Sequence, residues 1–263
     1  MGGPPPPAVT EDRELLAIAV EAARAAAAIL VERYEDARGP HGLQTKSTPT
    51  DLVSDADLAA ERAIRHVLAA RRPDDSILGE EGDDVTGTTG LRWVVDPLDG
   101  TVNYLFGIPQ WSVSIACEHH AGVVLDPVRG ELFEVVAGEA PMLDGKPLRA
   151  SERADLSTAL VATGFNYDAA VRERQAEVVA ALLPRIADIR RVGSAALDLA
   201  WTAAGRYDAY YEHGVNPWDI AAGAMLCTGA GLEVRRLPPA DGLPGGVLAA
   251  PAALVDELSR MVT

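Results

Sequence analysis

The sequence has few of the features that mark secreted, membrane or nucleic-acid-binding proteins. Cys117 and Cys227 are its only cysteines and lie far apart in apolar segments, which predicts buried free thiols in a reducing cytosol rather than a disulfide framework. Basic residues number 23 against 39 acidic ones, and the net charge of -16 argues against binding nucleic acid or an anionic membrane surface. No apolar run approaches the length needed to span a membrane.

The first residues, MGGPPPPAVT, also lack a targeting signal. They contain no basic region followed by an apolar one, so they do not resemble a secretion signal, and the sixth residue is not the Ser or Thr of a myristoylation site. The run of prolines predicts a disordered tail over residues 1–9. The cytoplasm is therefore the expected location.

The hydrophobic content, 48% of 263 residues, is sufficient for a large core. In the N-terminal half, residues 10–150, Thr10 is expected to cap one helix and Ser54 with Asp57 a second. A largely antiparallel sheet should follow the two helices. The apolar runs that predict its strands lie at residues 76–78, 91–95, 111–117, 121–125 and 132–136.

In the C-terminal half, residues 151–263, strands and helices alternate. Strands are predicted at residues 160–163, 189–192, 208–212, 232–234 and 247–248, and helices at residues 169–186, 195–204, 218–229 and 252–261. Ser194 can cap the helix that follows it. This order predicts an α+β or α/β layered sandwich, with the two halves closely packed as one unit.

The stretch WVVDPLDGTVNYLFG carries two acids, Asp96 and Asp99, out of an apolar strand and into a predicted tight turn. Two interpretations compete. Asp, Pro and Gly are ordinary turn formers, and alternatively the two carboxylates bind a cation. Gly100 permits a close backbone approach, and residues 101–106 could form a short helix whose free N–H groups attract phosphate.

Other acids also follow apolar segments or open helices: Asp57, Glu80 with Glu81, and Asp219. Taken singly, each has an ordinary explanation. Asp57 can be a helix cap, Glu80 and Glu81 can lie in a solvated loop, and Asp219 can interact with the dipole at a helix start. If they converge, two carboxylates about 4 Å apart repel by roughly 4 kcal/mol at an effective dielectric near 20. Convergence therefore requires cations, and oxygen ligands without His or Cys favour Mg²⁺, Mn²⁺ or Ca²⁺ over Zn²⁺.

Six motifs together resemble the inositol monophosphatase family: KSTPTDLVSDAD, ILGEEG, WVVDPLDGTVNY, RVGSAALD, DAYYEHG and NPWDIAAGAM. The resemblance extends from about Leu43 to Leu258, and GSAALDLAWTAAGRYDAYYEHG is similar to the actinobacterial-type members. It implies alternating αβαβα layers, a homodimer, and hydrolysis of a small phosphate monoester with two or three Mg²⁺ per active site, Mn²⁺ being possible. It also implies sensitivity to lithium.

The resemblance implies a set of metal ligands. Glu80 and Asp96 would hold the first metal with the Leu98 carbonyl. Asp96 would bridge to a second metal held by Asp99 and Asp219. Glu80 would also help to place a third metal.

It further implies catalytic and substrate contacts. Besides Glu80, the catalytic residues would be Thr101 and Asp57, which orients Thr101 to help deprotonate the attacking water. The N–H groups of Gly100 and Thr101 would bind the phosphate. The substrate hydroxyls would meet Glu212, Asp99 and the backbone of Gly193, Ser194 and Ala195. Asp219 would lie near the leaving group. Lys46 matches a position near the third metal, and Glu81 follows Glu80 in the motif.

The predicted reaction is hydrolysis of inositol 1-phosphate to inositol and phosphate by in-line attack of a metal-activated water. Another phosphatase of the superfamily, acting on histidinol phosphate, fructose 1,6-bisphosphate or a 3′-phosphonucleotide, is the first alternative. A partner-binding regulatory protein that keeps the phosphatase fold is the second. The chain departs from the family in a short hairpin, CEHHAGVV, in GEAPMLDG, which lacks a Gly-x-Gly, and in Ser194, where Thr is common.

Overall fold

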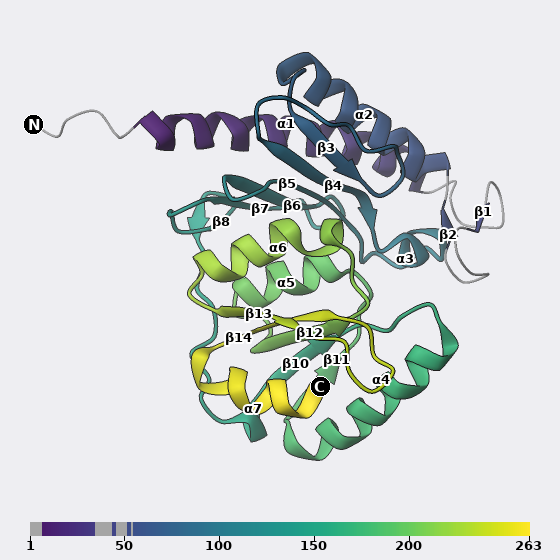
Figure 1. Ribbon diagram of the computed structural model, residues 1–263, viewed down its shortest axis with the longest axis vertical. Helices are drawn as coiled ribbons and strands as arrows, with labels where there is room; N and C mark the ends of the chain where they lie inside the picture. Colours follow the sequence, from purple (N-terminus) through teal and green to yellow (C-terminus); the bar gives the residue numbers. More distant parts are fainter. Residues whose placement is uncertain (1–6, 35–43, 46–51, 54) are drawn as a thin grey trace, which may run out of the picture.

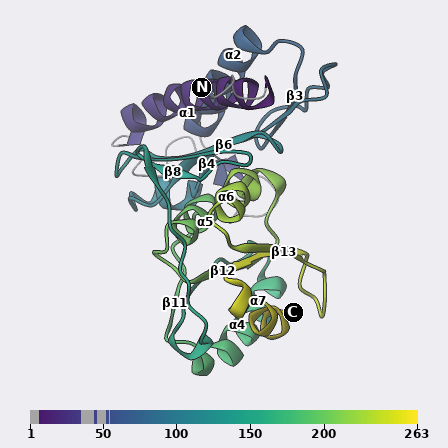
Figure 2. The same cartoon turned by 90° about the vertical axis from the view of Figure 1, so that its left-hand side faces the viewer.

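The chain forms two large β-sheets that alternate with pairs of helices in the computed structural model (Figure 1), and β1 (Gln44–Thr45) and β2 (Leu52–Val53) form a separate two-stranded sheet. The structure describes residues 7–34, 44–45, 52–53 and 55–263. From one end of the stack to the other, the pairs are α1 (Pro7–Tyr34) with α2 (Asp55–Arg71), α5 (Ala195–Ala203) with α6 (Pro217–Gly229), and α4 (Ala169–Leu182) with α7 (Ala252–Val262). Figure 2 shows the same order from the side, with α5 and α6 between the sheets. The predicted αβαβα layered sandwich is confirmed.

The first sheet has seven strands in the order β3-β4-β5-β6-β7-β8-β9. Its strands are β3 (Ser76–Gly79), β4 (Arg92–Asp99), β5 (Ser112–Cys117), β6 (Ala121–Asp126), β7 (Glu131–Val136), β8 (Met142–Leu143) and β9 (Lys146–Pro147). Only β3 and β4 run parallel within this sheet, and its other neighbours are antiparallel. The largely antiparallel character predicted for this half is therefore correct.

The second sheet has five strands in the order β11-β10-β12-β14-β13. They are β10 (Leu160–Thr163), β11 (Asp188–Arg190), β12 (Ala209–His213), β13 (Glu233–Leu237) and β14 (Gly246–Ala250). β10 runs parallel to both β11 and β12, whereas β14 is antiparallel to β12 and β13. Shorter elements are β1 (Gln44–Thr45), β2 (Leu52–Val53), α3 (Thr101–Leu105), η1 (Leu156–Thr158) and η2 (Leu183–Arg185).

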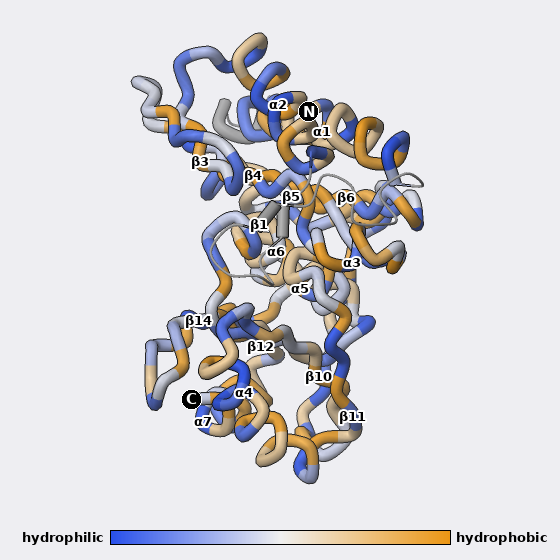
Figure 3. Tube along the Cα trace, turned by 90° about the vertical axis from the view of Figure 1, so that its right-hand side faces the viewer, coloured by the Kyte–Doolittle hydropathy of each residue, from blue (hydrophilic) through white to orange (hydrophobic). Residues whose placement is uncertain are grey.

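Successive residues of the central strands enter different hydrophobic cores, because side chains alternate between the two faces of a sheet. Val123 of β6 packs toward α1 and α2, while Val124 packs toward α5 and α6. In the second sheet, Tyr210 joins the core of α5 and α6, and Tyr211 joins the core that contains α7. Strands buried on both faces are continuously apolar, which is why the sequence predicts them well. Figure 3 shows hydrophobic segments within the layers and hydrophilic ones in many outer loops.

Several predicted boundaries are wrong. Helix α1 begins at Pro7, so Thr10 lies within the helix and does not precede it; residues 1–6 of the predicted tail and Ser54 lie outside the described residues. Helix α4 ends at Leu182 because the next turn, which contains Pro184, is a 3-10 helix. Strand β11 covers residues 188–190 rather than 189–192.

Cys117 and Cys227 are buried free cysteines, as predicted. Among the described residues, no helix combines the length and hydrophobicity that crossing a membrane requires.

Candidate active site

Strand β4 carries Asp96 and Asp99 around a β-bulge. Asp96 pairs with Ser114 and Asp99 with Ser112, so three steps along β4 face two along β5. Pro97 has no N–H for the ladder, and a bulge is one of the few places in a sheet that tolerates proline. The tight turn predicted here is therefore wrong, because the strand continues through Asp99 and the bulge redirects its carboxylates.

Glu80 follows β3 directly beside these acids. Gly79, the last residue of β3, pairs with Val95 in parallel register, so the chain brings Glu80 level with Asp96 on the adjacent strand. Two motifs separated by a polar loop thus meet at the same edge of the sheet.

The chain turns at Gly100 immediately after the bulge. Its φ of 96° is left-handed, and it precedes the first residue of α3. A Cβ atom built there would lie 2.9 Å from the Gln110 carbonyl oxygen and 3.3 Å from the Gly193 carbonyl oxygen. Only glycine satisfies both the conformation and the close approach.

Thr101 connects this turn to α2. Its hydroxyl lies 3.0 Å from Asp57 Oδ1 and 3.0 Å from the Leu98 carbonyl oxygen, and it can donate to either acceptor. Asp57 is only 1% exposed although it belongs to the first turn of a helix. The side chain therefore contacts Thr101 across the fold, as the family resemblance implies.

These residues border a cavity of about 230 Å³. The predicted site residues that line it are Glu80, Asp96, Leu98, Asp99, Gly100, Thr101, Gly193, Ala195, Glu212 and Asp219. Asp57 and Ser194 are buried behind its wall and contact Thr101 and Asp99 respectively. Glu81 does not belong to the lining: its N–H donates to Glu61 Oε2 at 2.7 Å. Lys46 lies outside the described residues.

The start of α5 holds the Asp99 carboxylate. Asp99 Oδ2 accepts hydrogen bonds from the Ser194 hydroxyl at 2.5 Å and the Ala196 N–H at 2.7 Å, and Oδ1 accepts from the Ala195 N–H at 3.3 Å. Ser194 is also the predicted helix cap and accepts from the Leu197 N–H at 3.3 Å. The Ala195 N–H, predicted to meet a substrate hydroxyl, thus contacts Asp99 in this structure.

The buried carboxylates of the cavity are destabilised in their charged form. Burial, reinforced by repulsion first from Glu80, raises the pKa of Asp96 well above its usual range. Burial likewise raises the pKa of Asp99 to about 6, although hydrogen bonds from the start of α5 lower it. Burial and the charge of Asp99 raise the pKa of Asp219 well above its usual range. A cation between these groups would relieve the repulsion and replace part of the lost hydration.

The donor set fits a hard divalent cation. It consists of carboxylate oxygens and the Leu98 carbonyl, without nitrogen or sulfur ligands, which suits Mg²⁺ or Mn²⁺. Within the part of the chain that the structure describes, however, no three acidic, His or Cys side chains converge on one point as they stand. Asp99 is directed to α5, and Asp219 Oδ2 accepts from the Asn216 N–H at 2.6 Å. Binding a metal would therefore require these side chains to share or exchange those contacts.

Asn103 joins the two halves beside the cavity, and the sequence analysis did not identify it. Its Nδ2 donates to the Gln110 carbonyl and the Val192 carbonyl, each at 2.7 Å. The amide thereby ties α3 to the segment that leads into Gly193. Its place in the DGTVN run was the available signal.

We expect Asn103→Ala to destabilise the fold by about 2–3 kcal/mol, because it leaves one buried and one partly buried carbonyl group without their donor. Chemical denaturation monitored by circular dichroism measures this change. Asn103→Asp, which keeps the size but loses the donor, should show a similar loss, and wild-type stability in both variants would contradict the role of the amide.

Two further charged residues from the RVGSAALD motif lie at or near the cavity. Arg191 is the one basic residue of the described lining, and its guanidinium lies 5.8 Å from the centre of the Phe165 ring. Asp198 is 1% exposed, and both of its carboxylate oxygens lack a hydrogen-bond partner among the described residues. Burial and repulsion by Glu212 raise the pKa of Asp198 well above its usual range, so its neutral form is favoured.

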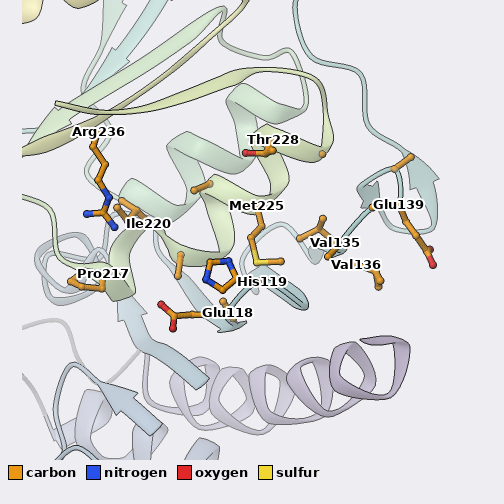
Figure 4. A pocket seen from close by; sticks show the side chains of 17 residues that line it. Glu118, His119, Val135, Val136, Glu139, Pro217, Ile220, Met225, Thr228 and Arg236 are labelled. Atoms are coloured by element: carbon orange, nitrogen blue, oxygen red, sulfur yellow. The ribbon is translucent and has the colours of Figure 1, made fainter. Parts of the chain in front are cut away.

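A larger cavity, of about 820 Å³, lies between α6 and the first sheet. Figure 4 shows Ile220 and Met225 of α6 on one side, with Val135 and Val136 of β7 also among its lining. Its lining is mainly apolar and includes none of the acids that the sequence analysis identified. The smaller, acidic cavity is therefore the better candidate for phosphate chemistry.

Comparison with known proteins also indicates a phosphatase. The model of the inositol monophosphatase family matches residues 11–260. Inositol-1-monophosphatase SuhB of Mycobacterium tuberculosis is 45% identical over an alignment of 234 residues that covers 84% of this chain and 81% of that protein. Nus factor SuhB of Pasteurella multocida is 42% identical over an alignment of 223 residues that covers 82% of this chain and 83% of that protein.

Solved structures agree. The crystal structure of the extragenic suppressor protein suhB from Bartonella henselae superposes with a TM-score of 0.86 at 32% identity, and the match covers 95% of this chain and 98% of that one. Fold, motifs and relatives thus converge on one conclusion: the chain belongs to the inositol monophosphatase family, resembles its actinobacterial-type members, and is a phosphatase.

Proposed function

We propose that this phosphatase hydrolyses inositol 1-phosphate to inositol and phosphate with the help of Mg²⁺. The observation that carries the proposal is the acidic cavity in which Glu80, Asp96, Asp99 and Asp219 surround the Gly100–Thr101 turn. Bound Mg²⁺ would neutralise the phosphate charge and lower the pKa of the attacking water. Its ligands would be Glu80, Asp96, Asp99 and Asp219 with the Leu98 carbonyl.

The protein's own groups would handle the proton and the geometry of attack. Asp57 lies where it can accept the hydroxyl proton of Thr101, so that as Thr101 takes a proton from the attacking water, its own proton would pass to Asp57. The backbone N–H groups of Gly100 and Thr101 would bind the phosphate and hold it in line with that water.

Glu212 supports a polyol as the leaving group. It lines the same cavity as the β4 acids, and Tyr210 donates to its Oε2 at 2.8 Å. The remaining lone pairs of this carboxylate can accept hydrogen bonds from substrate hydroxyls. Other polyols offer the same donors, so Glu212 supports inositol within a wider class.

A panel of phosphate esters tests the proposal. We expect turnover of inositol 1-phosphate with Mg²⁺ and a loss of activity in EDTA that added Mg²⁺ restores, because the buried carboxylates need a cation to hold the phosphate. The panel should also contain histidinol phosphate, fructose 1,6-bisphosphate and a 3′-phosphonucleotide, assayed by phosphate release. If one of these esters has a higher kcat/KM than inositol 1-phosphate, that ester would be assigned as the substrate instead.

A sugar bisphosphate is the second candidate, and Arg191 is the observation that favours it. A guanidinium at the wall of an otherwise acidic cavity can pair with a second phosphate group. A preference for fructose 1,6-bisphosphate in the same panel would support this alternative.

The family resemblance also supports a homodimer, which sedimentation of the purified protein would test. A non-catalytic, partner-binding role is the third candidate, since several relatives are named as Nus factors. Turnover with Mg²⁺ and none with EDTA would contradict a purely regulatory role. A location in the cytoplasm and sensitivity to lithium stay predictions from the sequence.

A further inference from the structure

We propose that Glu61 is a positioning residue that sets the loop carrying Glu80, an inference that rests on the proposed function for its catalytic meaning. Glu61 is 2% exposed and lies on α2, four residues after Asp57. Residues four apart occupy the same face of a helix. Helix α2 thus directs two carboxylates toward the site: Asp57 contacts Thr101, and Glu61 contacts the loop after β3.

The two oxygens of Glu61 have different partners. Oε1 accepts from Arg65 Nε at 2.6 Å, and Oε2 accepts from the Glu81 N–H at 2.7 Å. The ion pair with Arg65 compensates the charge of Glu61 and fixes its orientation. The second oxygen then anchors the backbone one residue beyond Glu80.

The loop passes so close to this ion pair that a larger residue at Gly79 or Gly82 would have to displace the ends of the Glu61 and Arg65 side chains. A Cβ atom at Gly79 would lie 2.4 Å from Glu61 Oε1, and one at Gly82 would lie 2.6 Å from the same oxygen. Arg65 Nη2 would lie 2.7 Å and 2.8 Å from those two Cβ positions, and it is buried without a hydrogen-bond partner among the described residues. The pair therefore contacts the loop on both sides of Glu80 and Glu81.

The position of Glu80 follows from these contacts. Gly79 is fixed on one side by its pairing with β4, and Gly82 is fixed on the other by contact with Glu61 and Arg65. Groups that orient a metal ligand without touching the metal commonly change affinity or activity by 10–100-fold when removed. Glu61 would act in this way through Glu80.

Glu61→Gln tests the inference with three measurements. In metal-free protein, amide hydrogen exchange in residues 79–82 should become about tenfold faster, because the charge-assisted bond to the Glu81 N–H is weakened. Calorimetry should show Mg²⁺ affinity reduced 10–100-fold, and the Mg²⁺ concentration for half-maximal activity should rise in parallel. Glu21→Gln, which breaks an exposed ion pair with Arg71 on the outer helices, is the matched control and should change none of these.

A lower melting temperature with unchanged Mg²⁺ affinity and unchanged loop exchange would mean a structural role only and would overturn the inference. If Glu61→Gln does not fold, the same measurements are made on Arg65→Met, which keeps Glu61 but removes the ion pair. Arg65→Lys keeps the positive charge and should retain most of the Mg²⁺ affinity that Arg65→Met loses. A wild-type protein that binds Mg²⁺ yet hydrolyses none of the esters contradicts the proposed function alone. Normal Mg²⁺ affinity in the folded variants contradicts the role of Glu61 alone.

Discussion

Asp99→Asn is expected to lower kcat/KM by more than about 100-fold while leaving the fold intact. The loss should exceed that of changing an outer-shell group, because the substitution removes a charge from the predicted second metal site. The fold should persist because asparagine keeps an oxygen that can accept from the Ser194 hydroxyl and the Ala196 N–H. Steady-state kinetics and far-ultraviolet circular dichroism on the same sample give both readings.

The control for this change is Asp83→Asn, which neutralises an exposed acid in the loop after β3. It should retain wild-type activity, since Asp83 does not line the cavity. Wild-type turnover by Asp99→Asn would remove Asp99 from the predicted site.

Glu212→Gln is expected to stabilise the metal-free protein at pH 8 by up to roughly 3 kcal/mol. Burial raises the pKa of Glu212 from 4.5 to about 7, although the hydrogen bond from Tyr210 lowers it. The folded state therefore binds this proton more tightly than the unfolded state does. The contribution of this proton to the free energy of unfolding is fully present below pH 4.5. It decreases as the pH rises toward 7 and stays lost above that pH.

Glutamine never ionises, so it avoids this loss at high pH. The advantage of Glu212→Gln should therefore disappear near pH 4, where both states of the wild type hold the proton. Chemical denaturation in EDTA at pH 4, 6 and 8 measures the difference in the free energy of unfolding between Glu212→Gln and the wild type. Neutralising Glu212 also relieves repulsion on Asp198, which acts in the same direction. Glu173→Gln, at an exposed position on α4, provides the comparison, and a stability difference independent of pH would contradict the assignment.

The same variant should show reduced kcat/KM for inositol 1-phosphate. The Glu212 carboxylate would destabilise the empty protein but contact the substrate. Functional residues commonly lower stability in this way. Higher stability together with lower activity would support both the burial of Glu212 and its proposed role.

The central strands were predictable from sequence because they are buried on both faces and continuously apolar, and several helices show regular apolar spacing; the αβαβα order of the layers came from the family resemblance. The acids at the ends of strands were also identified from their order along the chain. The bulge at Pro97 was not, because Asp-Pro-Leu-Asp suits a turn equally well by local composition. Only the pairing of β4 with β5 distinguishes the two.

Glu61 and Asn103 illustrate a second limit. Each has an ordinary local explanation, Glu61 as a helix surface charge with Arg65 four residues later and Asn103 as a residue of a short helix. Their partners, the Glu81 N–H and the Val192 carbonyl, lie 20 and 89 residues away. Spacing along one helix or strand contains no information about such contacts, so these residues were found only once the tertiary arrangement was known.

The cavity takes its parts from both sheets, and this has a consequence for cooperativity. Asp96 and Asp99 belong to β4 in the first sheet, whereas Glu212 belongs to β12 in the second. The Asp99–Ser194 and Asn103–Val192 contacts span this junction. A fluctuation that separates the two halves by a few ångströms would dismantle the catalytic centre while every strand stayed paired with its neighbours, so inactivation on heating should precede the melting of either sheet.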